Sequence, residues 1–522
     1  MNTQPDSSTD KGISWQTWNE STFKMAQLRD KPILLMITAE WCYWCHVMLE
    51  DTYLDQAVVS HVNDNYIPVL VDNDQRPELN FRYNVGGWPT TAILTPHGGM
   101  LAGATYLTPD QLFSMLSEVT DAYNQDKPGL YDRSRELFLQ QQQRAARVGL
   151  SQVSTEVEPR IIDRNLIESI ARMSIGTYDP LYGGFGYEPK FPNAPVISLM
   201  IYLFQQTQEP FYELIIRKTL DALTTSSMTD KDEGGVFRYT KTRDWNDPQY
   251  EKLLDDNTAL SRSFLSAGLL LGDQQYLQAY QSITAFIHRD LYLKQSKSYR
   301  GSIGADSSYF GMTSLAKTHS VGPSADSWSY ISSTAKQASL IIKAYNNGIE
   351  LPLDSEELIM MLEVLYTKVS SEMSSHSYNE TADGEPTNLL VDVASVLEVL
   401  ASAINTSILP YAPWEDRLHE LANRMMSEYY DERRGAFFDI QLQQRQPGYM
   451  AIREKPLPDN IIAIRALIKY QETVSSTQYA DAIRISLISF LDVYQEYGEH
   501  SADFALLASE YLDIIQQDSI SA

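Results

Sequence analysis

The chain has 522 residues, of which 43% are hydrophobic and 21% are charged, and its formal net charge is -27. Because this length exceeds what one hydrophobic core usually serves, we expect two domains, and the acidic balance disfavours binding to nucleic acid or to an anionic membrane surface. The polar start, MNTQPDSSTDKG, lacks the basic patch and apolar run of a secretory signal, and no stretch approaches about 18 uncharged apolar residues. We therefore expect a cytoplasmic protein without a membrane anchor.

Apolar runs near the start of the chain predict the strands of one sheet. They are ILLMITA (33–39), YIPVLVD (66–72) and TTAILT (90–95), and a glycine turn at 98–99 then leads into LAGATY as an edge strand. A helical pattern runs from Cys42 to about Val59, between the first two strands. A thioredoxin-like sheet needs this order, so we predict an α/β thioredoxin-like domain over residues 14–125, after a flexible tail over 1–13.

The two cysteines of the chain, Cys42 and Cys45, lie in the sequence WCYWCH, directly after the first strand and at the start of a helix. A thiolate at a helix N-terminus is stabilised by unpaired amides and the helix dipole, so we expect Cys42 to be the attacking nucleophile. Cys45, one turn later, would resolve the mixed disulfide. This pattern predicts thiol-disulfide exchange with the thiols of a client protein or a reductase, and it requires no cofactor.

Two other interpretations of the cysteine motif are weaker. C-x-x-C-H also matches a c-type haem attachment site, but haem attachment needs a periplasmic, helical context. Cys42, Cys45 and His46 resemble three zinc ligands, but a fourth would have to come from His61, His97 or a carboxylate. We expect no metal.

A buried acid usually lies beneath the cysteines of thioredoxins, and Met36 occupies about that position here. We therefore expect His46 or Glu40 to serve as the base for Cys45.

The sequence GGWP (86–89) precedes the third strand, where thioredoxin-like folds place a cis-proline facing the cysteine pair. We predict that the bond between Trp88 and Pro89 is cis. Nearby backbone groups would then remain available to an extended peptide, and we expect Trp41, His46, Trp88 and Pro89 to contact it.

Residues 126–160, rich in Gln, Arg and Ser, are predicted to be a helical or partly ordered connector. The rest of the chain, 161–522, is predicted to be all helical. Twelve helical segments begin near residues 163, 193, 210, 255, 274, 326, 354, 386, 413, 459, 477 and 500. Six antiparallel hairpins suggest a closed (α/α)6 toroid of the six-hairpin glycosidase-like type, with an open helical solenoid as the rival.

A side chain able to cap a helix precedes every second helix of this series, namely Asn193, Asn257, Asp326, Asn388, Asn460 and Asp503. If alternate helices line the inside of a ring, these loops all open at one end and surround one funnel. An open solenoid would scatter them.

Carboxylates and aromatic side chains gather in those loops, as they do where helical toroids act on carbohydrates. The candidates for contact with a neutral polyhydroxylated or cationic ligand are Glu251, Asp255, Asp256, Asp459, Tyr182, Phe185, Phe237, Arg238, Tyr239 and Trp245. Structural roles as caps, ion-pair partners and aromatic plugs are the alternative for each. In a ring, we expect at least one of these acids to lack a basic partner and to have a raised pKa.

The chain resembles the family of spermatogenesis-associated protein 20, clearly from about residue 15 to 260 and more weakly beyond. The shared residues are Lys31-Pro32, Trp41-Cys42, Trp44-Cys45-His46-Val47-Met48, Val71-Asp72, Arg76-Pro77, Gly86-Gly87-Trp88-Pro89, Leu94-Thr95-Pro96, Gly183-Gly184-Phe185-Gly186, Pro189-Lys190-Phe191-Pro192, Gly234-Gly235, Phe237-Arg238-Tyr239, Glu251-Lys252 and Asp256-Asn257. The resemblance implies a thioredoxin-type fold and a sugar-hydrolase-like or epimerase-like toroid, without a settled substrate.

The chain departs from the family pattern at two histidines. The family's C-H-W-C-H is C-Y-W-C-H here, and its P-H-F-E-K is P-Q-Y-E-K (248–252), which removes any role that rests on those histidines. Two hypotheses follow. In the first, a thiol-disulfide oxidoreductase carries a toroid that binds a client or a sugar-like ligand. In the second, the toroid is a carbohydrate-active enzyme and the thioredoxin-like part is an interaction module.

Overall fold

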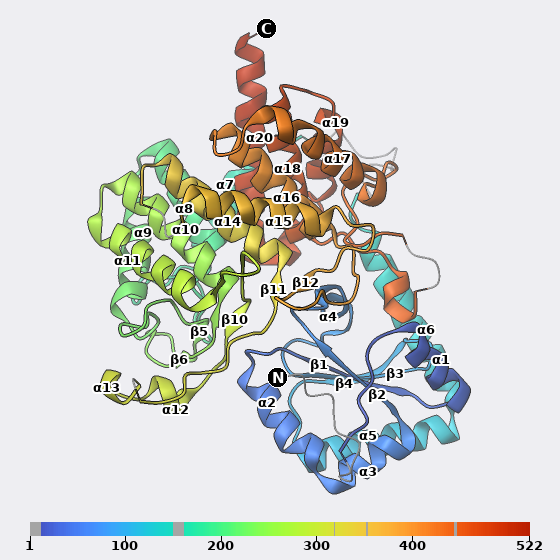
Figure 1. Ribbon diagram of the computed structural model, residues 1–522. Helices are drawn as coiled ribbons and strands as arrows, with labels where there is room; N and C mark the ends of the chain where they lie inside the picture. Colours follow the sequence, from blue (N-terminus) through green and yellow to red (C-terminus); the bar gives the residue numbers. More distant parts are fainter. Residues whose placement is uncertain (1–11, 150–160, 318, 351–352, 443–445, 522) are drawn as a thin grey trace. The chain divides into compact units, whose positions relative to one another are not determined.

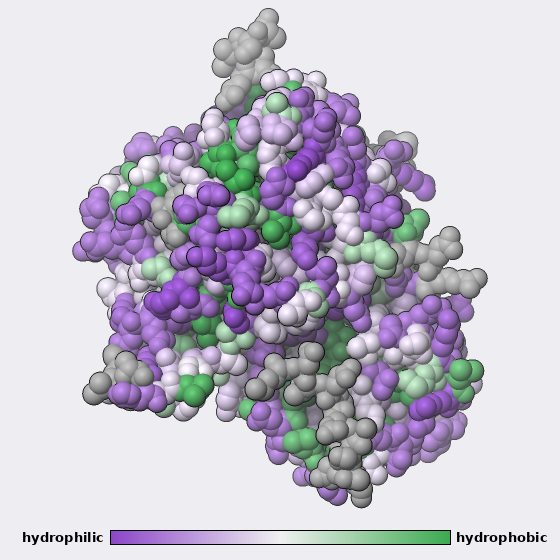
Figure 2. Space-filling view, in the orientation of Figure 1, coloured by the Kyte–Doolittle hydropathy of each residue, from purple (hydrophilic) through white to green (hydrophobic). Residues whose placement is uncertain are grey.

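The computed structural model describes residues 12–149, 161–317, 319–350, 353–442 and 446–521. The chain divides into two compact units (Figure 1). Unit 1 comprises Met1–Arg144 and Gln443–Ile452, and unit 2 comprises Ala145–Leu442 and Arg453–Ala522. Hydrophilic residues cover most of the face seen in Figure 2, as the strongly acidic composition leads one to expect. Within the described ranges, no helix is both long and apolar enough to span a membrane.

Unit 1 is built on a four-stranded sheet with the order β2-β1-β3-β4, in which β1 pairs with β2 in parallel and with β3 antiparallel. The predicted thioredoxin-like sheet is confirmed. Its elements are α1 (Glu20–Arg29), β1 (Ile33–Thr38), α2 (Tyr43–Glu50), η1 (Thr52–Leu54), α3 (Gln56–Asn65), β2 (Ile67–Asp72), α4 (Pro77–Tyr83), β3 (Thr90–Leu94), β4 (Met100–Ala104), α5 (Pro109–Gln125) and α6 (Lys127–Ala145).

The core of this unit follows from the alternation of side chains along the strands. Leu34 and Met36 of β1 and Ile93 of β3 point to one face, where they pack with apolar residues of α2, α3 and α5. Helix α6, which lies in the predicted connector, counts almost entirely with unit 1. The boundary expected at residue 126 therefore falls inside this unit.

A short segment from late in the chain completes unit 1. The Tyr449 ring stacks on Tyr83 at 5.2 Å between centroids, and the Tyr83 hydroxyl accepts the Tyr449 amide at 2.8 Å. Arg82 donates to the carbonyl oxygens of Tyr449 and Ile452 at 3.2 and 2.7 Å. The segment 446–452 is thus part of the thioredoxin-like unit, although more than 300 residues separate it from the α4 residues that it contacts.

Unit 2 is a closed ring of helical hairpins. The inner helices α8, α10, α14, α16, α18 and α20 each pack against the next, and α20 packs back against α8. The predicted (α/α)6 toroid is confirmed, and the open solenoid is excluded. The long helices are α7 (Arg164–Ile175), α8 (Ala194–Thr207), α9 (Pro210–Thr225), α10 (Leu254–Leu271), α11 (Gln274–Phe286), α14 (Ile331–Asn346), α15 (Ser355–Val369), α16 (Leu390–Asn405), α17 (Tyr411–Tyr429), α18 (Leu457–Val474), α19 (Ala480–Ser489) and α20 (His500–Ser521).

The loops of the toroid carry short elements. Two-residue strands pair as β5 with β6, β7 with β10, β8 with β9 and β11 with β12. Their bounds, with those of the short helices, are β5 (Tyr239–Thr240), β6 (Pro248–Gln249), β7 (Lys252–Leu253), η3 (Ile287–Leu291), β8 (Tyr292–Leu293), β9 (Ser298–Tyr299), β10 (Ser302–Ile303), α12 (Ser307–Phe310), α13 (Ser314–Lys317), β11 (Ser329–Tyr330), β12 (Ser377–Tyr378), η4 (Gly448–Ala451) and η5 (Tyr494–Tyr497), of which η4 belongs to unit 1.

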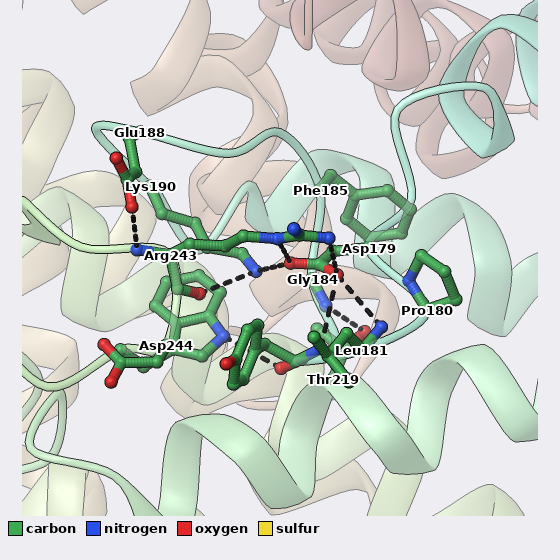
Figure 3. Close-up of polar contacts among 12 residues, drawn as sticks. Asp179, Pro180, Leu181, Gly184, Phe185, Glu188, Lys190, Thr219, Arg243 and Asp244 are labelled. Atoms are coloured by element: carbon green, nitrogen blue, oxygen red, sulfur yellow. Dashed lines mark hydrogen bonds and ion pairs between the residues drawn. The ribbon is translucent and has the colours of Figure 1, made fainter.

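Three loops of the toroid repeat the same charged turn, in which a lysine ammonium lies 2.7 Å from an aspartate oxygen. The pairs are Lys190 with Asp179, Lys252 with Asp230 and Lys455 with Asp431. Figure 3 shows the first turn, where Arg243 also donates to Asp179. Burial alone would raise the pKa of each carboxyl, but the cations and turn amides hold all three pKa values below the ordinary value.

The expected caps of the inner helices are mostly not caps. Asn193 stands at the N-cap position of α8 but makes no side-chain capping bond. Asn257 lies inside α10, where its side chain accepts a hydrogen bond from the Val236 amide and donates one to the Val236 carbonyl. Asn460 in α18 makes the same two hydrogen bonds with the backbone of Phe437. The N-cap residues of α10, α14, α16 and α18 are Leu253, Tyr330, Leu389 and Pro456.

The other three residues also differ from the prediction. Asp326 accepts from the Tyr330 hydroxyl, Asn388 accepts the Ser374 amide, and Asp503 lies in the first turn of α20. The capping interpretation is therefore wrong for five of these residues, and Asn193 has the N-cap position without the capping hydrogen bond. Polar side chains next to a helical pattern are as useful for tying a loop to a helix as for capping it.

Candidate functional site

The cysteine motif of unit 1 has the predicted strand-to-helix placement. Cys42 is the N-cap residue of α2, and its Sγ accepts a hydrogen bond from the Cys45 amide at 3.2 Å. Cys45 is fully buried, whereas Cys42 retains 5% exposure. An amide donor at a helix N-terminus favours the thiolate, so the geometry fits Cys42 as the outer, attacking sulfur.

Aromatic residues and aspartates hold the loop that carries the motif. The Trp41 indole donates to Asp74 at 2.7 Å and meets the Trp88 ring edge-on at 5.5 Å. The bond between Trp88 and Pro89 is cis, as predicted. Tyr43 and Trp44 are exposed at 44% and 47% beside the cysteines. The motif therefore has an aromatic rim.

His46 lies next to the cysteines, and its orientation is fixed by the backbone. Its Nε2 is 2.7 Å from the carbonyl oxygen of Glu40, and because a carbonyl only accepts, Nε2 carries the proton. In the neutral ring, Nδ1 is then the atom able to accept a proton. The Glu40 side chain is exposed, and Met36 is fully buried in the strand. Among the residues that the structure describes, no three His, Cys, Asp or Glu side chains form a group able to hold a metal ion.

Unit 2 contains a central cavity of about 1210 Å³, lined by all six inner helices. Its lining extends from the first turns of these helices, at Asp255, Asp256 and His500, to their last turns, at Gln205 and Asn405. The first turns of α10, α16, α18 and α20 all carry aspartates. The helix starts thus form one acidic mouth, as the ring hypothesis predicts.

Two acids at this mouth lack partners. Asp256 and Asp459 make no hydrogen bond or ion pair with any described residue, and the pKa of each is raised to about 7. Burial is the main cause for both, and the neighbouring carboxylates Asp255 and Asp439 add to it. The expectation of an unpaired carboxyl with a raised pKa is confirmed. Asp256 lines the cavity, and Asp459 directly follows the lining residue Pro458.

The other two predicted acids, Asp255 and Glu251, differ in their partners and in the direction of their pKa shifts. Asp255 lines the cavity and pairs with Lys336 of α14 at 2.6 Å, which lowers the pKa of Asp255 although burial opposes this. Glu251 is only 4% exposed, its Oε2 has no hydrogen-bond partner among the described residues, and burial raises its pKa. Glu251 is outside the cavity lining but acts electrostatically on Asp256.

Of the predicted aromatic and basic contacts, Arg238 lines the cavity and the aromatic residues do not. Phe185, Phe237 and Trp245 are buried loop plugs, and a Cβ on Gly184 would lie 2.5 Å from Trp245. The remaining two, Tyr182 and Tyr239, lie outside the lining as well. Phe191, which stacks on Tyr239 at 4.8 Å, is an aromatic ring that lines the cavity next to the start of α8.

The sequence analysis also missed charged residues, one pair at the mouth and others deeper in the ring. His376 Nδ1 lies 2.8 Å from Asp392 at the mouth. Further along the inner helices, the cavity is lined by Arg262, Lys343, Glu398, Arg465, Lys469, Glu472 and Glu510. They lie on the inner helices α10, α14, α16, α18 and α20, and charges within such helical patterns are the signal that could have revealed them.

The fold and these sites define a class of protein: a thioredoxin-like domain with a C-x-x-C motif, joined to an (α/α)6 toroid with a polar central cavity. Residues 6–142 match the family model Thioredox_DsbH, described as a protein of unknown function, DUF255. The chain is similar to spermatogenesis-associated protein 20 of Rattus norvegicus, with 27% identity over 304 residues. The human protein gives 26% identity over the same length. The resemblance stated from the sequence motifs is confirmed.

The match covers 53% of this chain and only 37% of the rat protein. Among solved structures, a D-mannose isomerase aligns with a TM-score of 0.53 and 9% identity, over 69% of this chain and 100% of that one. Cellobiose 2-epimerase from Spirochaeta thermophila DSM 6192 aligns with a TM-score of 0.51 and 13% identity, over 68% and 98% of the two chains. At such identities, the alignments establish the toroid fold alone.

Proposed function

We propose that unit 1 catalyses thiol-disulfide exchange through Cys42 and Cys45. The position of the Cys42 sulfur at the N-cap of α2, accepting the Cys45 amide, is the observation that carries this proposal. The Cys42 thiolate attacks a disulfide of the client, forming a mixed disulfide and releasing one client thiolate. Cys45 then loses its proton and attacks Cys42, forming the Cys42–Cys45 disulfide and releasing the second client thiolate.

In this exchange the protein dithiol loses two electrons and two protons, which the client disulfide gains as two thiols. An external dithiol reductant returns unit 1 to its reduced form. We assign the exchange to the cytoplasm, where thiols are kept reduced, because a cysteine pair in that compartment is better suited to catalysis than to a structural disulfide. The exposed rings of Tyr43 and Trp44 and the groups at Trp41, His46, Trp88 and Pro89 form the surface on which an extended client would bind.

Mixed-disulfide trapping with the full chain tests this proposal. Cys45→Ser should accumulate a covalent adduct with a synthetic peptide that contains one disulfide, whereas Cys42→Ser should not. Limited alkylation followed by mass spectrometry should label Cys42 before Cys45 in the reduced protein. Earlier labelling of Cys45, or no disulfide under mild oxidant, would contradict the assignment.

We propose further that the central cavity of unit 2 binds a sugar-like ligand. The specific observation is a cavity of about 1210 Å³, lined in part by charged side chains, in which Asp256 has no partner among the described residues. An unpaired acid is available to exchange hydrogen bonds with the hydroxyl groups of a ligand. The structural neighbours, a D-mannose isomerase and a cellobiose 2-epimerase, agree with this ligand class. In the alternative, the toroid is itself a carbohydrate-active enzyme and unit 1 an interaction module.

Calorimetric titration with mannose and cellobiose tests the second part. Asp256→Asn and Glu251→Gln should each weaken binding, and Glu209→Gln, on an exposed loop, serves as the matched control. Unchanged affinity in both variants would remove the two acids from the site. Turnover of either sugar by the wild-type chain would favour the enzymatic alternative.

A further inference from the structure

Deep in the central cavity, two cations on neighbouring helices are held by serines across the same helix pair. Arg262 of α10 donates through Nη2 to Ser339 of α14 at 3.2 Å, and Lys343 of α14 donates to Ser266 of α10 at 2.6 Å. All four residues line the cavity. Arg262 lies six residues beyond Asp256, which places it about 9 Å further along α10 than the acidic mouth.

Neither cation has a carboxylate partner among the residues described. Elsewhere in unit 2, each of the lysines Lys190, Lys252 and Lys455 lies against an aspartate at 2.7 Å. Both side chains are half-buried in the wall of the cavity, and a charge that is partly removed from water without an ionic partner costs free energy, so a fold that served only its own stability would pair these groups or do without them. The reciprocal serine bonds orient Arg262 and Lys343 but do not neutralise them.

The acids on the facing helices form no ion pair with Arg262 or Lys343 in the described structure. Arg465 of α18 pairs with Glu510 of α20 at 3.0 Å, and Lys469 pairs with Glu472 at 2.8 Å. Glu398 of α16 acts on Arg262 electrostatically but makes no ion pair with any described residue, and burial raises the pKa of Glu398.

We infer that Arg262 and Lys343, with the hydroxyls of Ser266 and Ser339, form a subsite for an anionic group of the ligand in the central cavity. The inference rests on the proposed binding of a sugar-like ligand in unit 2, and it narrows the ligand to a sugar that carries a phosphate or a carboxylate. A planar guanidinium binds either group through two parallel hydrogen bonds, an ammonium adds a point charge, and hydroxyls donate to the remaining oxygens.

The titration behaviour of Lys343 agrees with this assignment. Burial and the charge of Arg262 lower the pKa of Lys343 to about 8. A bound anion would raise that pKa again, and by linkage its affinity should fall as the pH rises through 8. The charged groups that line the same depth of the cavity are Arg262 from α10, Glu398 from α16, Arg465, Lys469 and Glu472 from α18, and Glu510 from α20, and of these Arg262 acts on the pKa of Lys343.

Anion titrations of the full chain test the subsite. Sulfate and phosphate should bind saturably to the wild type at constant ionic strength, and acetate tests whether a carboxylate suffices. Lys343→Met and Arg262→Gln should each weaken sulfate binding by about tenfold or more, as expected for the loss of a charge-assisted hydrogen bond. Lys469→Met removes a cavity cation that is already paired, and as the matched control it should leave binding within about twofold.

Arg262→Lys keeps the positive charge and should retain part of the affinity for sulfate. This variant shows whether the loss in Arg262→Gln reflects the missing charge or misfolding. Absence of saturable sulfate and phosphate binding in the wild type, or equal losses in Lys469→Met and Lys343→Met, would overturn the inference. Because sulfate does not titrate near neutrality, its affinity should fall between pH 7 and pH 9 in the wild type but not in Lys343→Met.

Sugar titrations separate this inference from the proposed function. Glucose 6-phosphate and glucuronate should bind at least tenfold more tightly than glucose, and Lys343→Met should abolish the difference. Binding of all three sugars with equal affinity would agree with the proposed sugar site but contradict the anion subsite. Binding of sulfate without binding of any sugar would support the anion subsite and contradict the proposal of a sugar-like ligand.

Discussion

Unit 2 pairs the buried lysines of three loop turns with aspartates, whereas some charged side chains in its central cavity have no ionic partner among the described residues. In the loop turns, Lys190, Lys252 and Lys455 each lie 2.7 Å from an aspartate and are almost fully buried. In the central cavity, Asp256 and Lys343 form no ion pair with any described residue. The loop pairs are satisfied within the fold, whereas no described residue forms an ion pair with these two cavity groups.

This difference shows how to separate structural from functional charge in one domain. The Lys252 ammonium also donates to the Gly234 carbonyl at 2.8 Å, so both the side chain and the backbone of the turn contribute hydrogen-bond acceptors to this lysine. Substitutions in the turns should therefore act on stability. Substitutions in the cavity should act on binding and on pH dependence, with small or favourable effects on stability.

The largest expected effect is from breaking a loop pair. Lys252→Met leaves Asp230 buried without its counterion, and it should destabilise unit 2 by about 3–5 kcal/mol. Urea unfolding followed by circular dichroism measures the loss. The double variant with Asp230→Asn should recover much of it, because no lone charge remains. A loss below about 1 kcal/mol would mean that the pair is not structural.

A smaller loss is expected from the backbone of the same turn. Gly235 has φ +81°, and a Cβ there would lie 2.6 Å from Phe286 Cδ1. Gly235→Ala should therefore cost about 2–3 kcal/mol, from left-handed strain and overpacking together. Gly272→Ala is the matched control, since its φ is +64° with nothing within 4 Å, and it should cost only about 1 kcal/mol. Equal losses in the two variants would show that the contact with Phe286 is unimportant.

The sequence predicted the elements of both units well because their patterns are local. Apolar runs of six or seven residues fixed the strands around Cys42, and helical periodicity gave all twelve long helices of the ring. The segment at Tyr449 could not be assigned to unit 1 in this way, because its place depends on packing against Tyr83. The predicted aromatic contacts failed for the same reason: burial of Trp245 under Gly184 is a tertiary property.

The candidate site was predictable at its mouth and not in its depth. Asp255 and Asp256 are adjacent at the start of a helix and form a recognisable pair, whereas Arg262 and Lys343 have no charged neighbour beside them in the sequence. A single charge in a helical pattern normally marks a face exposed to solvent. Only closure of the ring turns that face toward a cavity.

The pH dependence of stability sharpens the comparison further. Because the pKa of Asp256 is about 7 in the fold and 3.8 ordinarily, the folded state holds this proton more tightly. Its contribution is full below pH 3.8 and is lost as the pH rises through 7. Asp256→Asn should flatten this loss and be more stable than the wild type at pH 8, by on the order of 1 kcal/mol after solvent screening. Lower stability of the variant at pH 8 would contradict the absence of a partner.

The smallest expected effect is the most discriminating, because it applies the same substitution to the other region. Lys343→Met removes a cation whose hydrogen bond in the described part of the chain is to Ser266, so the fold should be unchanged or stabilised by up to about 1 kcal/mol. Lys252→Met has the opposite sign, although both changes replace a lysine in unit 2 by a side chain of similar length. Urea unfolding of the two variants in one buffer without sulfate or phosphate gives the comparison directly. Added sulfate should then stabilise the wild type but not Lys343→Met, because only the wild type retains both cations. If Lys343→Met destabilised the fold as much as Lys252→Met does, the charge in the cavity would be structural, and the contrast between the two regions would fail.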